Sequence, residues 1–193
     1  MVPVISVLLL GGRCRSCGAA IPDHLLRIEV AATFAAALAI GVVPGAAELA
    51  LSVAFLWVLI GQFYCDLLYF RLPDPLTFAL FVLGLGLAFI DPSRSLGTAV
   101  LSAAVASASF LLIRWVYAHM RGREGLGLGD VKLMAGVGAA VGWADVPVVT
   151  LIAAVLALLV VLLDLLRGNA PKGDAPVPFG SYLCAATALV VVM

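Results

Sequence analysis

Charged side chains are scarce in this chain. Asp, Glu, Lys and Arg make up 11% of its 193 residues, whereas about a quarter is usual in soluble domains. Apolar residues make up 64%, and the mean hydropathy is +1.20. The formal net charge is zero, so the chain has no basic excess of the kind that binds nucleic acid. This composition excludes a soluble domain, implies no nucleic-acid partner, and predicts a protein embedded in a lipid bilayer.

Cysteine is also rare, and its four occurrences do not form a disulfide framework. Only Cys14 and Cys17 form a spaced pair. Such a pair is half of a zinc site, because structural zinc usually takes four ligands. No second CxxC exists in the sequence. The pair either binds zinc with help from Asp23, His24 or a second subunit, or stays reduced and unliganded, which is the interpretation we favour.

Long apolar runs dominate the remainder. The first run, residues 2–10, is too short to cross a bilayer and lacks the preceding basic residues of a signal peptide. Seven longer runs follow, separated by turns rich in Pro and Gly: 25–43, 46–65, 75–90, 95–119, 130–143, 146–166 and 179–193. They predict an all-α, polytopic membrane protein with about seven transmembrane helices. We expect residues 1–24 to be a short cytoplasmic segment and residues 25–193 to be the membrane-embedded domain.

The basic residues indicate the orientation. If the N-terminal loop is cytoplasmic, every Lys and Arg except Arg94 falls in or beside a cytoplasmic loop, as the positive-inside rule requires. The N-terminus is then cytoplasmic and the C-terminus lies outside. The same assignment places two acids, Asp66 and Asp130, at the cytoplasmic face.

These two acids are the candidate catalytic residues, because an ionisable group at the edge of a membrane span is costly. The structural alternative for Asp66 is an ion pair, for example with Arg71, and the alternative for Asp130 is a helix N-cap. Taken together, two neighbouring carboxylates tend to share one proton. One then activates water while the other protonates the carbonyl or the leaving amine. The pair predicts hydrolysis without a metal or a covalent intermediate.

Glycine and proline mark the segments around both acids. Gly127 and Gly129 precede Asp130 and would let an extended peptide approach the backbone. Pro73 belongs to the turn after Asp66, and Asp74 is predicted to cap the next helix. Lys132 and the small residues of 136–142 suit close helix packing.

These motifs resemble those of the type IV prepilin peptidases, which are GxGD-type aspartyl peptidases. The matching segments extend over almost the whole chain: PVIS at residues 3–6, GRCRSCG at 12–18, Glu29, DLLYFRLPD at 66–74, GLGDVKL at 127–133 and PFGSY at 178–182. The combination is far more specific than a GxGD pattern alone.

The resemblance implies an aspartic endopeptidase of the bacterial inner membrane. Such enzymes remove the leader of type IV prepilins and pseudopilins at the cytoplasmic face, cutting after a glycine just before the apolar helix of the substrate. The resemblance implies Asp66 and Asp130 as the catalytic pair, and it makes Gly127, Gly129, Lys132, Pro73 and Asp74 motif positions near the substrate. Many members also N-methylate the new N-terminus with S-adenosylmethionine.

The sequence departs from the longer family pattern at its start. It lacks the N-terminal helix with its upstream motif and the first CxxC pair. We expect a naturally short member or a fragment that begins at an internal Met. In either case zinc binding at Cys14 and Cys17 and methyltransferase activity do not follow from the resemblance.

Two functions of other classes also use paired acids in a membrane. A small proton-coupled transporter would show inverted repeats with acids near mid-membrane, and no such repeat is apparent. A catalytically inactive assembly protein of a pilus or secretion machinery would keep the acids as structural partners. The intact pair argues against that alternative.

Overall fold

The computed structural model describes residues 12–13, 16–123, 125–168 and 177–192. In this part of the chain the fold is all-α, as the sequence predicts. The helices are α2 (Asp23–Val42), α3 (Ala46–Tyr69), α4 (Asp74–Ile90), α5 (Leu96–Arg121), α6 (Leu128–Val141), α7 (Val146–Leu166) and α8 (Phe179–Val192). Their bounds follow the seven apolar runs, including the two shortest ones.

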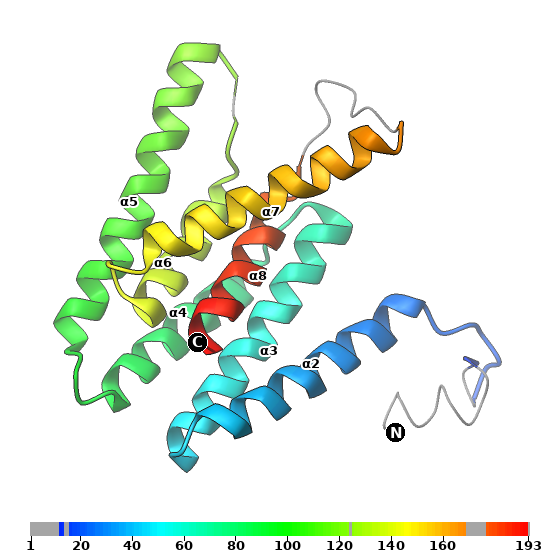
Figure 1. Cartoon of the computed structure of the whole chain (residues 1–193), viewed down its shortest axis with the longest axis horizontal. Helices are drawn as coiled ribbons and strands as arrows, with labels where there is room; N and C mark the ends of the chain where they lie inside the picture. The colour runs from blue at the N-terminus through cyan, green and yellow to red at the C-terminus, as the bar shows by residue number, and fades with distance from the viewer. Residues whose placement is uncertain (1–11, 14–15, 124, 169–176, 193) are drawn as a thin grey trace.

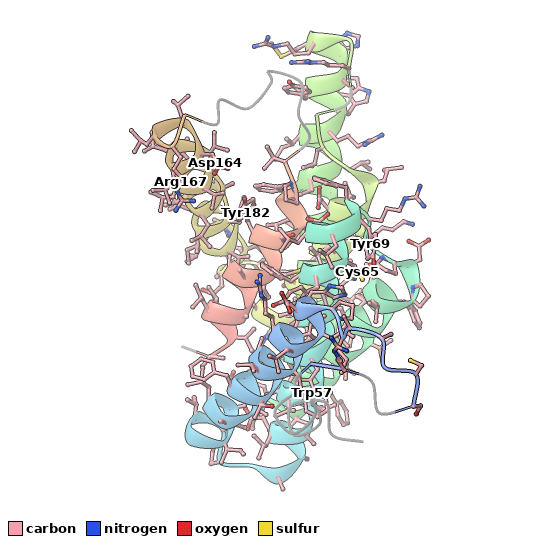
Figure 2. The ribbon with its side chains drawn as sticks, turned by 90° about the vertical axis from the view of Figure 1, so that its right-hand side faces the viewer. Trp57, Cys65, Tyr69, Asp164, Arg167 and Tyr182 are labelled. Atoms are coloured by element: carbon pink, nitrogen blue, oxygen red, sulfur yellow. The ribbon has the colours of Figure 1, made fainter. Side chains whose placement is uncertain are left out.

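Two short helices, α6 and α8, form the middle of the bundle. α6 packs on α4 and α5, α8 packs on α3 and α7, and the two contact each other. Figure 1 shows α8 in red between α3 and α7, with α2 at the edge of the molecule. α2 contacts α3 through a hydrogen bond, in which the indole N–H of Trp57 on α3 (labelled in Figure 2) donates to the carbonyl of Ala32 on α2 at 3.0 Å. α6 buries most of its residues, whereas α2 buries only Ala39.

Helix length separates four of the helices from the other three. Four helices, α2, α3, α5 and α7, are long and apolar enough to cross a bilayer. The other three are shorter than the roughly 20 residues that a crossing needs: α4 has 17, and α6 and α8 have 14 each. The all-helical membrane fold is thus confirmed. The number of crossings stays a prediction.

Glycines bring α6 unusually close to its neighbours. A Cβ added at Gly138 of α6 would lie 2.6 Å from the carbonyl oxygen of Ser102 on α5. One added at Gly84 of α4 would lie 2.8 Å from the carbonyl oxygen of Gly136 on α6. Such short approaches exist only because these residues have no side chain. This is the packing that the small residues after Asp130 predict.

Two arginines hold the ends of α6. Arg94, in the turn between α4 and α5, donates hydrogen bonds to the carbonyls of Ala139, at 3.1 Å, and Ala140. These carbonyls belong to the C-terminal turn, which lacks backbone donors and favours a cation. At the opposite end, Arg114 of α5 donates to the carbonyl of Leu126, just before α6. The first turn of α6 therefore has a defined position.

The close packing of α6 predicts that two Gly→Ala substitutions change the stability of the protein differently. Gly138→Ala should lower the free energy of unfolding by about 1–3 kcal/mol, because the new methyl group overlaps the α5 backbone. Gly41→Ala in α2 meets nothing within 4 Å, so it should be neutral or stabilise by up to about 1 kcal/mol. Thermal unfolding in detergent, followed by circular dichroism, compares the two variants. Equal effects would contradict the packing described here.

Candidate active site

Asp66 lies in the last turn of α3, and its side chain is only 7% exposed. The helix ends at Tyr69, where the following residue, Phe70, takes a left-handed conformation with φ of 52°. The Phe70 N–H closes the helix by donating to the carbonyl of Asp66 at 2.8 Å. The chain therefore turns sharply toward α4 immediately after the acid.

Asp130 lies in the first turn of α6 and is also 7% exposed. The N-cap position belongs to Gly127, so the alternative role of Asp130 as an N-cap is not what the structure shows. The first turn of a helix carries unpaired N–H groups and a positive dipole end, which favour a carboxylate. The start of α6 thus lowers the cost of a negative charge on Asp130 whenever this acid is ionised.

The two acids meet at Gly180, the second residue of α8. A Cβ added at Gly180 would lie 2.9 Å from Oδ1 of Asp130 and 3.1 Å from Cγ of Asp66. The two carboxyl groups therefore both lie close to one point, and these two atoms are at most about 6 Å apart. Even a methyl group at Gly180 would displace one of them. Helices α3, α6 and α8, far apart in the sequence, converge here.

Ser181 holds Asp66 in place. Its backbone N–H donates to Oδ2 of Asp66 at 2.7 Å, and its hydroxyl lies 3.0 Å from the same oxygen. The hydroxyl also lies 3.1 Å from the carbonyl of Phe63. Among the described residues, no ion pair joins Asp66 to Arg71, so that structural alternative is not seen.

Gly180 and Ser181 are the site residues that sequence reasoning missed. The PFGSY segment that contains them matches the family pattern, and that match was the available signal. Nothing in the segment itself indicates which residue contacts an acid, because the contact depends on how α8 packs against α3.

The acids open into a cleft of about 640 Å³. Its lining includes every candidate motif residue of the sequence analysis that lies near the acids: Pro73, Asp74, Gly127, Gly129 and Lys132. The structure thus brings together residues from the α3–α4 turn, the start of α4, and the start of α6 with the residue just before it. Whether they bind substrate stays a prediction.

The predicted capping role of Asp74 is wrong. Pro73 occupies the N-cap position of α4, and no side chain caps this helix. Asp74 is the first helical residue and instead forms an ion pair with Lys132 of α6, with 2.6 Å between Oδ1 and Nζ. The pair is exposed, so it contributes little to stability. It joins the rims of the cleft contributed by α4 and α6.

The glycine beside Asp130 lies against a side chain of the α3–α4 turn. A Cβ at Gly129 would lie 3.0 Å from Cδ1 of Leu72, in the turn after α3. The two segments that carry the acids can therefore approach each other closely. The approach of an extended peptide to this glycine stays a prediction. Gly127 adopts an extended conformation with φ of −69°, which other residues also adopt.

The predicted zinc half-site cannot be assembled from the described residues, because Cys14 lies outside them. Cys17 is an exposed free thiol. In the part of the chain that the structure describes, no three His, Cys, Asp or Glu side chains gather as metal ligands. Zinc binding at Cys14 and Cys17 stays a prediction.

Comparison with known proteins gives two family matches. The type IV leader peptidase family matches residues 53–162, and the bacterial peptidase A24 N-terminal domain matches residues 1–42. Residues 53–162 include both Asp66 and Asp130. These matches confirm the family resemblance that the sequence motifs indicate.

Three relatives carry the name prepilin leader peptidase/N-methyltransferase. The Aeromonas hydrophila protein is 36% identical over 187 residues, which are 96% of this chain and 63% of that protein. The Burkholderia pseudomallei protein is 38% identical, covering 95% of this chain and 59% of that protein. The Pseudomonas aeruginosa protein is 31% identical, covering 96% of this chain and 63% of that protein. The chain thus spans about three fifths of the length of these relatives. No solved structure matches it.

The contact between Ser181 and Asp66 predicts an energetic coupling. In a double-mutant cycle of Asp66→Ala and Ser181→Ala, the coupling in the free energy of unfolding should be about 1.5–3 kcal/mol, because a buried carboxylate loses a hydroxyl donor. The same cycle with Asp91→Ala, in the turn between α4 and α5, serves as the control and should give less than about 0.5 kcal/mol. Equal coupling in both cycles would show that Ser181 does not hold Asp66.

Proposed function

Because the chain belongs to the type IV leader peptidase family, we propose that it is an aspartic endopeptidase that removes the leader of type IV prepilin or pseudopilin precursors. The observation that carries this proposal is the convergence of Asp66 and Asp130 on Gly180, at the wall of one cleft. Two buried carboxylates this close cannot both ionise easily and tend to hold one proton between them. This is the arrangement that activates water for peptide hydrolysis.

The hydrogen bonds suggest which acid is the base. The backbone N–H of Ser181 donates to Oδ2 of Asp66 at 2.7 Å and stabilises the ionised form of this acid. We therefore assign Asp66 as the general base and Asp130 as the acid that holds the shared proton. The two acids titrate as a pair, so this assignment describes the state in which the reaction starts.

The reaction follows from that starting state. Asp66 takes a proton from water, and the water oxygen attacks the scissile carbonyl carbon while Asp130 protonates the carbonyl oxygen. The resulting gem-diol then collapses. Its hydroxyl returns a proton to Asp130, the C–N bond breaks, and Asp66 gives its proton to the leaving amine. Both carboxyl groups end as they began, with one water consumed.

The cleft supports binding of an extended peptide. Gly127 is exposed beside Asp130, and Gly129, Pro73, Asp74 and Lys132 line the same opening. We assign these five residues to the substrate-binding surface. The two acids and one water molecule complete this reaction, so the proposed proteolysis requires no cofactor. The relatives' names also include N-methyltransferase.

The arrangement of the helices suggests how the chain lies in the membrane. Adjacent helices reverse direction along the chain, so the ends of α3, α5 and α7 and the starts of α2, α4, α6 and α8 lie toward one side. This side carries the dyad and most basic residues, which favour the cytoplasmic face. We place the protein in the bacterial inner membrane as a multi-pass protein, with residues 1–24 and the cleft at the cytoplasmic face and residues 25–193 in contact with lipid.

Substitution of either acid tests the proposed function. In membranes that contain this chain and a pilin precursor, the wild type should remove the leader after its final glycine. Asp66→Asn and Asp130→Asn should each lower kcat/KM by about 10³-fold or more, because neither variant retains an acid and a base.

Asp164→Asn is the control for this experiment. Asp164 is a carboxylate near the end of α7, and Figure 2 shows it beside Arg167. It is not one of the residues that line the dyad cleft. The control should keep activity within about twofold. Full cleavage by both dyad variants would overturn the proposed mechanism.

Ser181 is predicted to act as a positioning residue. Ser181→Ala should lower kcat about tenfold and leave KM nearly unchanged, because the hydroxyl contacts Asp66 rather than the cleft. Ser181→Thr keeps a hydroxyl and should restore most of kcat. Steady-state kinetics on the same precursor separates the two constants. A rise in KM alone, or no rescue by Thr, would contradict this role.

A further inference from the structure

We infer that a groove beside the dyad cleft binds the apolar helix that follows the leader in the substrate, an inference that rests on the proposed function. The groove, of about 460 Å³, is lined by Phe78 and Phe81 of α4 and by Val131 and Ala135 of α6. Its wall is mostly apolar, and Phe78 is 68% exposed. An apolar side chain this exposed at a hollow favours an apolar occupant.

The groove is continuous with the dyad cleft. Asp74 and Lys132 line both hollows, and their ion pair lies where the two meet. Both partners are more than half exposed, so the pair is solvated and separates at little cost. A peptide can therefore extend from the groove into the cleft past this pair, with its polar leader beside the dyad.

The direction of the groove fits a helix that enters from the bilayer. Asp74, Phe78 and Phe81 share one face of α4, and seven residues of helix rise about 10 Å. The groove thus runs for about two turns along α4, from its start near the dyad toward the midpoint of the helix. α6 forms its floor, because both α4 and α5 pack on α6 and only lightly on each other. Figure 1 shows α4 and α5 diverging from the turn that joins them.

The shared lining of the two hollows favours a peptide over a lipid chain as the occupant. Asp74 and Lys132 line both the groove and the dyad cleft. The bond to be cleaved must lie beside the acids in the cleft, so the residues that follow it along the substrate are within reach of the groove. A lipid chain has no part that must occupy the cleft at the same time.

Two substrates distinguish this inference from the proposed function. One is a precursor with its leader and apolar helix, and the other is a short peptide that spans the cleavage site and lacks the apolar helix. Ala135→Trp fills the groove and should raise KM about tenfold for the precursor while leaving the short peptide unaffected. Ala108→Trp places the same side chain on an exposed position of α5 outside the groove and should change neither.

The outcomes separate as follows. If the wild type cuts neither substrate, the proposed function fails and the groove inference fails with it. If the wild type cuts both and Ala135→Trp behaves like Ala108→Trp, only the groove inference is overturned. If Ala135→Trp cleaves neither substrate, the substitution has disturbed the fold. Crosslinking at Phe78 then decides whether the groove binds the apolar helix.

The crosslinking experiment leaves the groove unfilled. A benzophenone amino acid at Phe78, in the Asp130→Asn background, is irradiated with the full precursor in membranes. Adducts within the apolar helix of the precursor support the inference. Adducts to lipid alone, or to a second copy of this chain, overturn it.

Discussion

Two buried carboxyl groups lie against a glycine that has no room for a methyl group, and the rest of the site depends on this contact. Asp66, Asp130 and Gly180 come from α3, α6 and α8. Carboxylates so close repel each other in a medium of low dielectric constant. The backbone N–H of Ser181, which donates to Asp66, offsets part of that repulsion, and the proposed mechanism offsets more of it with one proton held between the two acids. The site is therefore stable only while three helices hold these groups in register.

The packing of α6 supplies that register. Glycines at positions 84, 136 and 138 let α6 approach α4 and α5 at backbone distance, and Arg94 and Arg114 hold its ends. A helix fixed in this way has little freedom to slide, so Asp130 stays opposite Asp66. The surface of the bundle is looser by comparison, because α4 and α5 diverge over α6 and leave the groove beside the dyad. A rigid centre and an open flank are what a protease needs if its substrate is itself a membrane helix.

Much of this could be predicted from the sequence. The apolar runs predict each helix, because length and hydropathy dominate in a membrane protein, and the flanking Pro and Gly mark their ends. The two motifs predict Asp66 and Asp130. Asp74 was misjudged as a cap because a short polar residue before Pro75 satisfies the local rule, whereas its actual partner, Lys132, lies on another helix. Gly180 and Ser181 were missed for the same reason, since only tertiary packing brings α8 against the acids.

The proximity of the two acids can be measured directly. We suggest replacing the native cysteines, introducing Asp66→Cys and Asp130→Cys together, and treating intact membranes with dibromobimane, which becomes fluorescent when it bridges two nearby thiols. Because both groups flank Gly180, the double variant should form the fluorescent bridge, whereas Asp91→Cys with Asp130→Cys should not. If 66 and 130 are not bridged while each single cysteine reacts with the reagent, the two acids do not face each other and the dyad is wrong.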